Sequence, residues 1–109
     1  MTQIQGYHAH LYYDEQSVEQ AEQLAQAAGE QFDIQVGRAH RKPVGPHTRW
    51  SCQLAFKPEL FQQVIPWLAL NRKGLTVFIH AQTGDEIKDH TDYTLWMGTI
   101  EPLNLDALR

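Results

Sequence analysis

Residues 6–13 have the sequence GYHAHLYY, in which two histidines stand one residue apart among tyrosines and small apolar side chains. Neighbouring side chains of a β-strand project to opposite faces, so residues i and i+2 share a face. One face of this predicted strand therefore carries His8, His10 and Tyr12. The other face carries the remaining side chains, Tyr7, Ala9, Leu11 and Tyr13. Two imidazoles on one face indicate that this side of the sheet is not ordinary core.

The next segments predict a helix and two further strands. Residues 14–32 have Glu15 in the first turn and Gly29 as a stop signal. Their apolar residues recur at helical spacing, at Val18, Ala21, Leu24, Ala25 and Ala28. Residues 32–41 and residues 49–56 alternate as strands, and the Pro/Gly turn KPVGPH separates them.

The second half of the chain predicts another helix and two more strands. Residues 57–74 form the helical pattern, with Pro58 suited to its first turn and Gly74 following its end. Pro66 lies inside this pattern and should kink or interrupt the helix. The apolar run LTVFIH, residues 75–80, predicts a fourth strand. A polar segment follows, and YTLWMG, residues 93–98, predicts a short fifth strand.

This order of elements, β-α-β-β-α-β with a C-terminal extension, predicts an α+β fold of the ferredoxin-like split βαβ kind in one domain, residues 1–109. The antiparallel sheet should have the spatial order 4-1-3-2, with both helices on one face. Alternation assigns an apolar set to the helix-covered face: Ala9, Leu11, Cys52, Leu54, Phe56, Leu75, Val77 and Ile79. The opposite face, open unless a tail or a second subunit covers it, receives His8, His10, Tyr12, Arg49, Ser51, Gln53, Thr76, Phe78 and His80.

Composition excludes several classes of function. The net charge is −4 and no basic stretch exceeds residues 38–42, which argues against a nucleic-acid partner. No apolar run approaches the roughly 18 residues of a membrane span, and the N-terminus lacks the apolar region of a signal peptide. The single Cys52, in an alternating apolar pattern, favours a buried thiol and a reducing cytoplasm.

The six histidines are the unusual feature of the composition. In the predicted sheet the first strand is central and the third and fourth run antiparallel to it. His80 should then lie beside His8, and His47 should lie closer to His10 and Tyr12. Imidazoles that converge from separate rigid elements are typical of metal sites.

Each histidine also has a simpler structural explanation. An isolated H-x-H pair can face solvent or stack on Tyr12, and His47 can be a loop residue. His40 is best explained as a surface residue on an edge strand. His90 can be a polar residue at a helix end, or an acid/base or second-layer residue beside Asp89 and Asp92. Asp85 and Glu86 fit a turn and a helix N-cap better than a ligand set.

Four blocks occur in order along the chain: GYHAHLYY, VGPHTRWSCQLAF, LTVFIHAQTGDEIKDHT and LWMG. Together they resemble the DOPA 4,5-dioxygenase family, from about residue 6 to residue 98. The resemblance implies a ferredoxin-like fold, often dimeric, and opening of a catechol ring by O₂ with non-haem iron. The histidines that match the blocks are His8, His10, His47, His80 and His90, whereas His40 falls outside them.

Extradiol cleavage needs Fe(II) with open positions, which two histidines and one carboxylate usually supply. We therefore expect ligands among His8, His10, His80 and His47. A carboxylate would come from the tail or from the segment after the first strand: Asp85, Glu86, Asp89, Asp14 or Glu15. The alternative is a metal held mainly by histidines, which would also suit Zn²⁺.

The remaining side chains have expected roles around the metal. His90 or His47 would move protons, Tyr12 would orient the catecholate, and Arg49 would orient a substrate carboxylate. Ser51 is expected on the substrate side, and Phe78 and Trp96 would form an apolar wall. Two other hypotheses stay open: a non-catalytic dimeric module that binds a metal or small molecule, and a histidine-bearing face that serves only as a homodimer interface.

Overall fold

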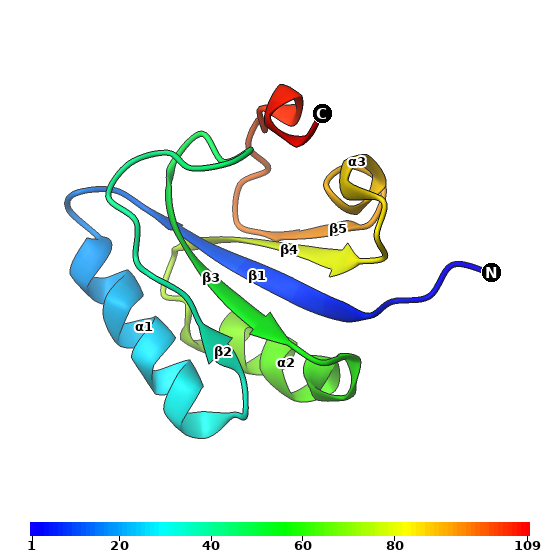
Figure 1. Cartoon of the computed structure of the whole chain (residues 1–109). Helices are drawn as coiled ribbons and strands as arrows, with labels where there is room; N and C mark the ends of the chain where they lie inside the picture. Colours follow the sequence, from blue (N-terminus) through cyan, green and yellow to red (C-terminus); the bar gives the residue numbers. More distant parts are fainter.

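Five antiparallel strands form one sheet in the computed structural model, which describes residues 1–109 (Figure 1). Across the sheet the strands are β2 (Gln35–Val36), β3 (Trp50–Phe56), β1 (Gly6–Tyr13), β4 (Thr76–Gln82) and β5 (Thr94–Met97). The order β4-β1-β3-β2 is the predicted one, and β5 extends the sheet beyond β4. The central strand is therefore the histidine-bearing β1.

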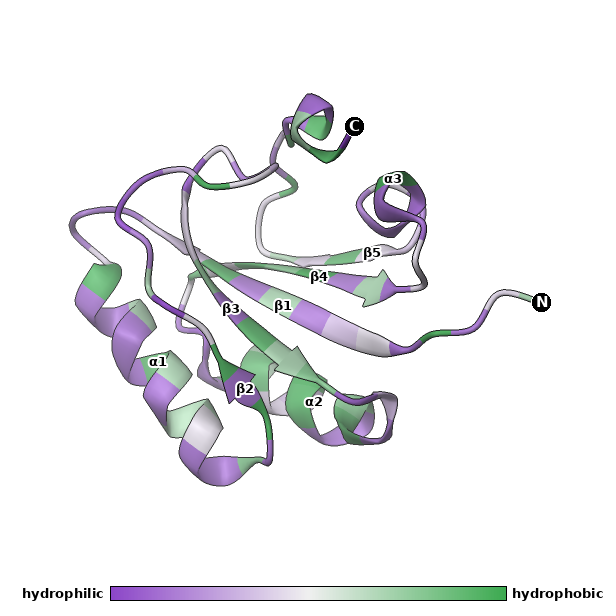
Figure 2. Cartoon of the chain, viewed as in Figure 1, coloured by the Kyte–Doolittle hydropathy of each residue, from purple (hydrophilic) through white to green (hydrophobic).

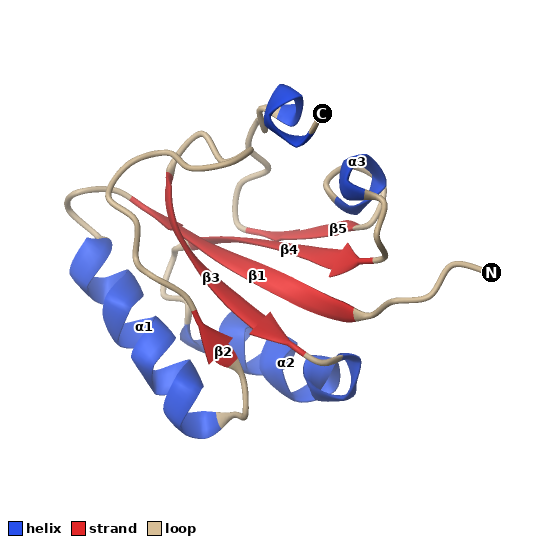
Figure 3. Cartoon of the chain, in the orientation of Figure 1, coloured by secondary structure: helices blue, strands red, loops and turns tan.

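The two long helices cover one face of this sheet, as Figure 3 shows. They are α1 (Val18–Gln31) and α2 (Phe61–Asn71), and a short 3-10 turn, η1 (Pro58–Leu60), leads into α2. The short α3 (Glu86–Asp89) and the C-terminal turn η2 (Leu105–Leu108) lie on the opposite side. The predicted α+β fold with split βαβ order is confirmed.

The edge strand β2 is much shorter than the predicted strand of residues 32–41. Only Gln35 and Val36 pair regularly with β3. Beyond them, Gly37 N donates to Gln53 O at 2.8 Å and His40 N donates to Ser51 O at 3.0 Å. The edge chain thus advances three residues while β3 advances two, so one extra residue bulges out and ends the regular ladder.

Both predicted boundaries of α1 were wrong. The Asp14 carboxylate accepts hydrogen bonds from Gln16 N at 2.9 Å and Ser17 N at 3.0 Å, which makes residues 14–17 a turn before the helix. The helix then continues past Gly29 to Gln31. A Cβ atom on Gly29 would lie 2.9 Å from Val36 Cγ2, so this glycine allows α1 to approach β2 closely.

Pro66 lies inside α2, and the helix continues through it, so the predicted interruption is absent. Proline removes the N–H that would bond to the carbonyl of Gln62. Gln62 and Pro66 are both exposed, so water can reach this carbonyl. After the helix the chain turns through Lys73 and Gly74, which have positive φ values of 48° and 86°. Gly74 thus follows the helix end as predicted.

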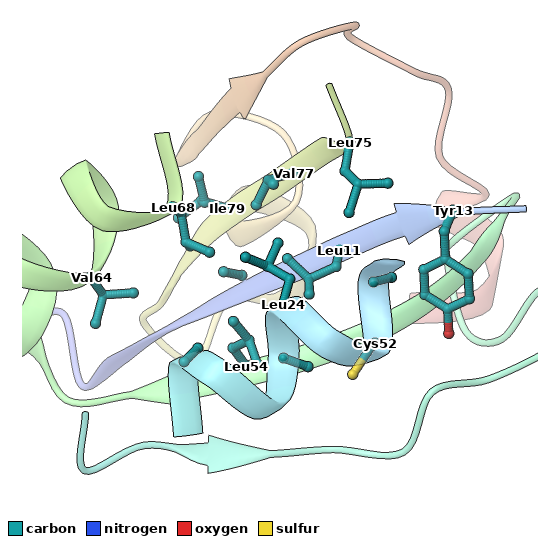
Figure 4. Packing of buried hydrophobic residues seen from close by; sticks show 14 of the residues in the cluster. Leu11, Tyr13, Leu24, Cys52, Leu54, Val64, Leu68, Leu75, Val77 and Ile79 are labelled. Atoms are coloured by element: carbon teal, nitrogen blue, oxygen red, sulfur yellow. The ribbon is translucent and has the colours of Figure 1, made fainter. Parts of the chain in front are cut away.

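The core fills the space between the sheet and the two helices (Figure 4). Every side chain predicted to face the helices belongs to this core. Figure 2 shows hydrophilic and hydrophobic residues interspersed along α1, as expected of a helix that packs on one side.

Cys52 is part of the core, and burial raises the pKa of its thiol to about 11, so it is a structural residue. No helix here has the length and apolarity needed to span a bilayer.

The C-terminal segment covers part of the other face of the sheet. Leu103 forms an isolated β-bridge with His47, and Asn104 N donates to Pro46 O at 2.8 Å. The Arg49 guanidinium forms an ion pair with Glu101 at 2.8 Å. Six polar or aromatic side chains of that face are buried, namely His10, Tyr12, Ser51, Thr76, Phe78 and His80.

Candidate functional site

A polar hollow of about 270 Å³ lies on the face of the sheet opposite α1 and α2. Five of the six histidines line it: His8, His10, His47, His80 and His90. Its other polar lining residues are Gln5, Gln53, Gln82, Glu86 and Asp89. The sixth histidine, His40, is not part of the lining. The predicted convergence of imidazoles on this face is therefore present.

Strand pairing brings three of these histidines together. His8 lies opposite His80 in the β1–β4 register, and His10 is two residues further along the same face of β1. His8, His10 and His80 can each offer a ligand atom within 4.8 Å of the others. The Nε2 atoms of His10 and His80 are 3.1 Å apart. Three imidazoles on two paired strands thus form a compact group that could hold a metal ion.

Backbone hydrogen bonds set the tautomers of two histidines. His80 Nδ1 lies 2.9 Å from Ala81 O, and His90 Nδ1 lies 2.7 Å from Glu86 O. A carbonyl oxygen can only accept, so Nδ1 carries the proton in each ring and Nε2 carries the lone pair, which in His80 faces His10 Nε2 at 3.1 Å. Metal-ligating histidines are commonly oriented by such a bond. The two rings are neighbours, with centroids 4.1 Å apart.

His47 approaches the group from the other end of β1. Its ring centroid is 4.1 Å from that of His10, and its Nδ1 is 2.8 Å from the Tyr12 hydroxyl. This is the position that the strand order predicted. Burial raises the pKa of Tyr12, so the hydroxyl keeps its proton and is able to donate to Nδ1.

Burial also favours the neutral form of four of these imidazoles by lowering their pKa values. It lowers the pKa of His47 and of His80 to about 4, with the neighbouring His90 adding to the effect in both. The pKa of His10 lies well below its ordinary value, chiefly through burial and then through His47. The pKa of His8 is also lowered, first by burial and then by His90. A neutral imidazole is the form that binds metal ions.

The predicted carboxylate candidates lie outside the three-histidine group. Asp89 is buried, and its carboxylate accepts bonds from Thr83 N at 2.8 Å and from Thr83 Oγ1 at 2.6 Å. Asp85 caps α3 by accepting a bond from Lys88 N at 3.1 Å. Asp14 belongs to the turn after β1, and the exposed Glu86 lines the hollow. The group that could hold a metal consists of histidines alone.

None of the predicted substrate-side residues, Arg49, Ser51, Phe78 and Trp96, lines the hollow itself. Phe78 and Trp96 stack with centroids 4.4 Å apart, and Phe78 also stacks with His10 at 5.8 Å. Ser51 is buried on the same face of the sheet. The Arg49 guanidinium is occupied by Glu101, and Arg49 does not line the hollow.

Two kinds of site residue escaped sequence reasoning. Gln5 and Gln82 line the hollow, but a glutamine beside a strand end has no distinguishing sequence signal. Leu108 reaches the lining from the tail, and Glu101 partners Arg49 from a position 52 residues away. Gln53 did have a signal, because it lies opposite His10 in the β1–β3 register and shares its face.

Comparison with known proteins adds independent information. The sequence model of the family described as "Dopa 4,5-dioxygenase family" matches residues 7–107. The crystal structure of a "putative dioxygenase" from Nostoc punctiforme is similar, with a TM-score of 0.94 and 44% sequence identity, covering 97% of this chain and 92% of that one.

Two curated sequences are also similar. An "Uncharacterized 21.2 kDa protein" from Botryotinia fuckeliana is 31% identical over 95% of this chain and 63% of its own length. A "DOPA 4,5-dioxygenase" from Amanita muscaria is 28% identical over 98% of this chain and 51% of its own length. The chain thus spans about half to two thirds of the length of these curated relatives.

Proposed function

Because the chain belongs to the Dopa 4,5-dioxygenase family, we propose that it is a metal-dependent dioxygenase that opens a catechol ring with O₂ in an extradiol manner. The observation that supports this proposal best is the set of five imidazoles in one hollow, three of them with ligand atoms within 4.8 Å of one another. A plain solvated face of a sheet would carry lysines and glutamates rather than buried histidines.

The proposed ligands are His8, His10 and His80, and the proposed resident metal is Fe(II). The donor set fits such an ion, because the three imidazoles are neutral and the Nε2 lone pair of His80 points into the group. Iron bound there would supply a site at which catecholate and O₂ bind together and exchange electrons. Zn²⁺ also suits three imidazoles, so zinc in purified protein would not identify the native metal.

The remaining residues are proposed to bind the substrate and move its protons. His90 has a free Nε2 that would accept the proton of one catechol hydroxyl. His47 is the second proposed acid/base, since the Tyr12 hydroxyl at 2.8 Å holds its ring in place. Phe78 and Trp96 are proposed to form an apolar wall behind His10, since Phe78 stacks on the rings of both His10 and Trp96 and neither Phe78 nor Trp96 lines the hollow. We assign Arg49 to anchoring the tail, because Glu101 occupies its guanidinium.

We further propose a homodimer in the cytoplasm. The exposed Leu95 on the edge strand β5 and the exposed Ile4 line an apolar hollow of about 410 Å³ beside this edge of the sheet. A free strand edge with apolar side chains is suited to contact with a second copy. The free thiol of Cys52 is compatible with a reducing compartment.

The experiment that tests the proposed activity is anaerobic reconstitution with Fe(II), followed by addition of 4-alkylcatechols and then O₂. Oxygen uptake together with a yellow ring-opened product is the expected result. The His10→Ala variant should lose the activity, whereas the matched His40→Ala variant should keep it, because His40 lies outside the hollow. Metal binding without oxygen uptake would instead support a non-catalytic binding module.

A further inference from the structure

We infer that Thr83 and Asp89 form a clamp that positions the His90 imidazole for proton transfer, and that Asp89 acts through this clamp and not as a metal ligand. The inference rests on the proposed function and adds two positioning residues to it. The three proposed ligands belong to the strands β1 and β4, whereas His90 follows α3, a helix of only four residues. One turn of helix is not stable by itself in water, so contacts outside the turn must hold it in place.

The clamp joins the end of β4 to the end of α3, which lie beside each other (Figure 1). Thr83 comes directly after β4, and Asp89 is the last residue of α3. The two oxygens of the Asp89 carboxylate accept hydrogen bonds from Thr83 N at 2.8 Å and from Thr83 Oγ1 at 2.6 Å. Asp89 is 3% exposed, so these bonds are shielded from water, and bonds to a charged acceptor are among the strong ones. They hold the end of α3 against the sheet.

His90 depends on this arrangement for both its position and its tautomer. Its Nδ1 donates to Glu86 O at 2.7 Å, a bond that needs the single turn of α3 to be intact. This bond keeps the proton on Nδ1 and leaves Nε2 able to accept one. The ring is 8% exposed, and its centroid lies 4.1 Å from that of His80. A shift of the end of α3 would therefore change both the basic nitrogen and its distance from the proposed metal ligand.

The chemistry of asparagine separates a positioning role of Asp89 from a role as ligand or charge. Asp89 lines the hollow but is not part of the group that could hold a metal. An asparagine has the same shape without the charge. Its Oδ1 can accept from Thr83 N, and its Nδ2 can donate to Thr83 Oγ1. Positioning should therefore survive in Asp89→Asn and be lost in Asp89→Ala, whereas a ligand or charge role would be lost in both variants.

The first measurement uses the metal-free protein and NMR of nitrogen-labelled histidine rings, which reports the tautomer of His90. We expect the proton on Nδ1 in the wild type, in Thr83→Ser and in Asp89→Asn. Thr83→Val removes only the hydroxyl and should give a mixture of tautomers, with faster hydrogen exchange at the His90 amide. Thr91→Val is the matched control, because the Thr91 hydroxyl bonds to Ile87 O at 2.7 Å in the same segment without touching the clamp. It should keep the wild-type tautomer.

The second measurement follows 4-ethylcatechol and O₂ on the Fe(II)-loaded protein. Thr83→Val and Asp89→Ala should lower kcat by about 10- to 100-fold, since a misplacement of roughly 1 Å costs about that much. Their iron content and the dissociation constant of the catechol without O₂ should stay near the wild-type values. Asp89→Asn should keep most of kcat. Adding Thr83→Val to His90→Gln should lower kcat no further, because the clamp acts through His90.

The outcomes separate the two proposals. The inference is overturned if Thr83→Val leaves either the tautomer of His90 or kcat unchanged. It is also overturned if Asp89→Asn is as inactive as Asp89→Ala, or if Thr83→Val lowers kcat equally with and without His90. If the iron-loaded wild type cleaves no catechol, the proposed function fails and the NMR measurement decides on the clamp alone. A mixture of tautomers in Thr83→Val then supports it, and an unchanged tautomer overturns it.

Discussion

Acidification should lower the free energy of unfolding of the metal-free protein. Replacing one buried histidine should make this decrease smaller by a defined amount. His47 and His80 are 7% and 3% exposed, and burial lowers the pKa of each from 6.5 to about 4. Between these two values the unfolded chain binds protons that the folded chain does not. Stability is therefore fully present above about pH 6.5 and is lost as the pH falls toward 4.

The size of the effect follows from the same values. A pKa difference of about 2.5 units corresponds to roughly 3 kcal/mol per histidine in the limit of low pH. At pH 5 about 2 kcal/mol of this has been lost for each of His47 and His80. The free energy of unfolding of the wild type should thus fall by about 4 kcal/mol between pH 8 and pH 5 from these two groups.

The assay is urea denaturation followed by circular dichroism, in the presence of a chelator, across that pH range. The His47→Gln variant should lose about 2 kcal/mol less than the wild type between pH 8 and pH 5. Carboxylates are common to both proteins and cancel in this comparison. His40→Gln is the matched control and should keep the wild-type pH dependence, because His40 lies outside the hollow. Equal pH dependence in His47→Gln and the wild type would refute the reasoning.

Three further perturbations test the fold, the tail and the assembly. Leu54→Ala removes a fully buried core side chain and should lower the free energy of unfolding, measured by chemical denaturation, by about 2–5 kcal/mol. A loss below about 1 kcal/mol would contradict the packing described. Glu101→Gln removes the ion pair with Arg49 and should loosen the tail. Hydrogen exchange of residues 101–104 should then become faster, while the amides of β1 keep their protection. Unchanged exchange in the tail would argue against anchoring by Arg49. Leu95→Lys should convert the proposed homodimer to a monomer in light scattering, and a wild type that is already monomeric would dispose of the dimer.

Much of the fold could be predicted because the central strand has a clear period of two. The alternation in residues 6–13 separates core from site, and all eight predicted helix-facing side chains are in the core. Prediction failed where a single residue changes the geometry. The bulge that shortens β2 leaves no trace in the alternation of residues 32–41, and Gly29 looks like a helix stop although it serves close packing against Val36.

The candidate site was predictable to the extent that strand register determines it. His8 lies opposite His80 because antiparallel neighbours of a central strand bring these positions together. The tail could not be placed in this way, because its contacts are irregular and long-range, as in the bond from Asn104 N to Pro46 O. For the same reason the partner of Arg49 was missed, and with it the reason why Arg49 is not free to bind a substrate carboxylate.

The most direct test of the central claim is the anomalous scattering of iron in crystals of the Fe(II)-loaded protein grown without oxygen. We predict one peak per chain, about 2.1 Å from a ring nitrogen of each of His8, His10 and His80. His47 and His90 should lie near this peak without binding it. A peak coordinated by other residues, or no peak in a fully loaded crystal, would contradict the assignment of the three histidines as the metal centre.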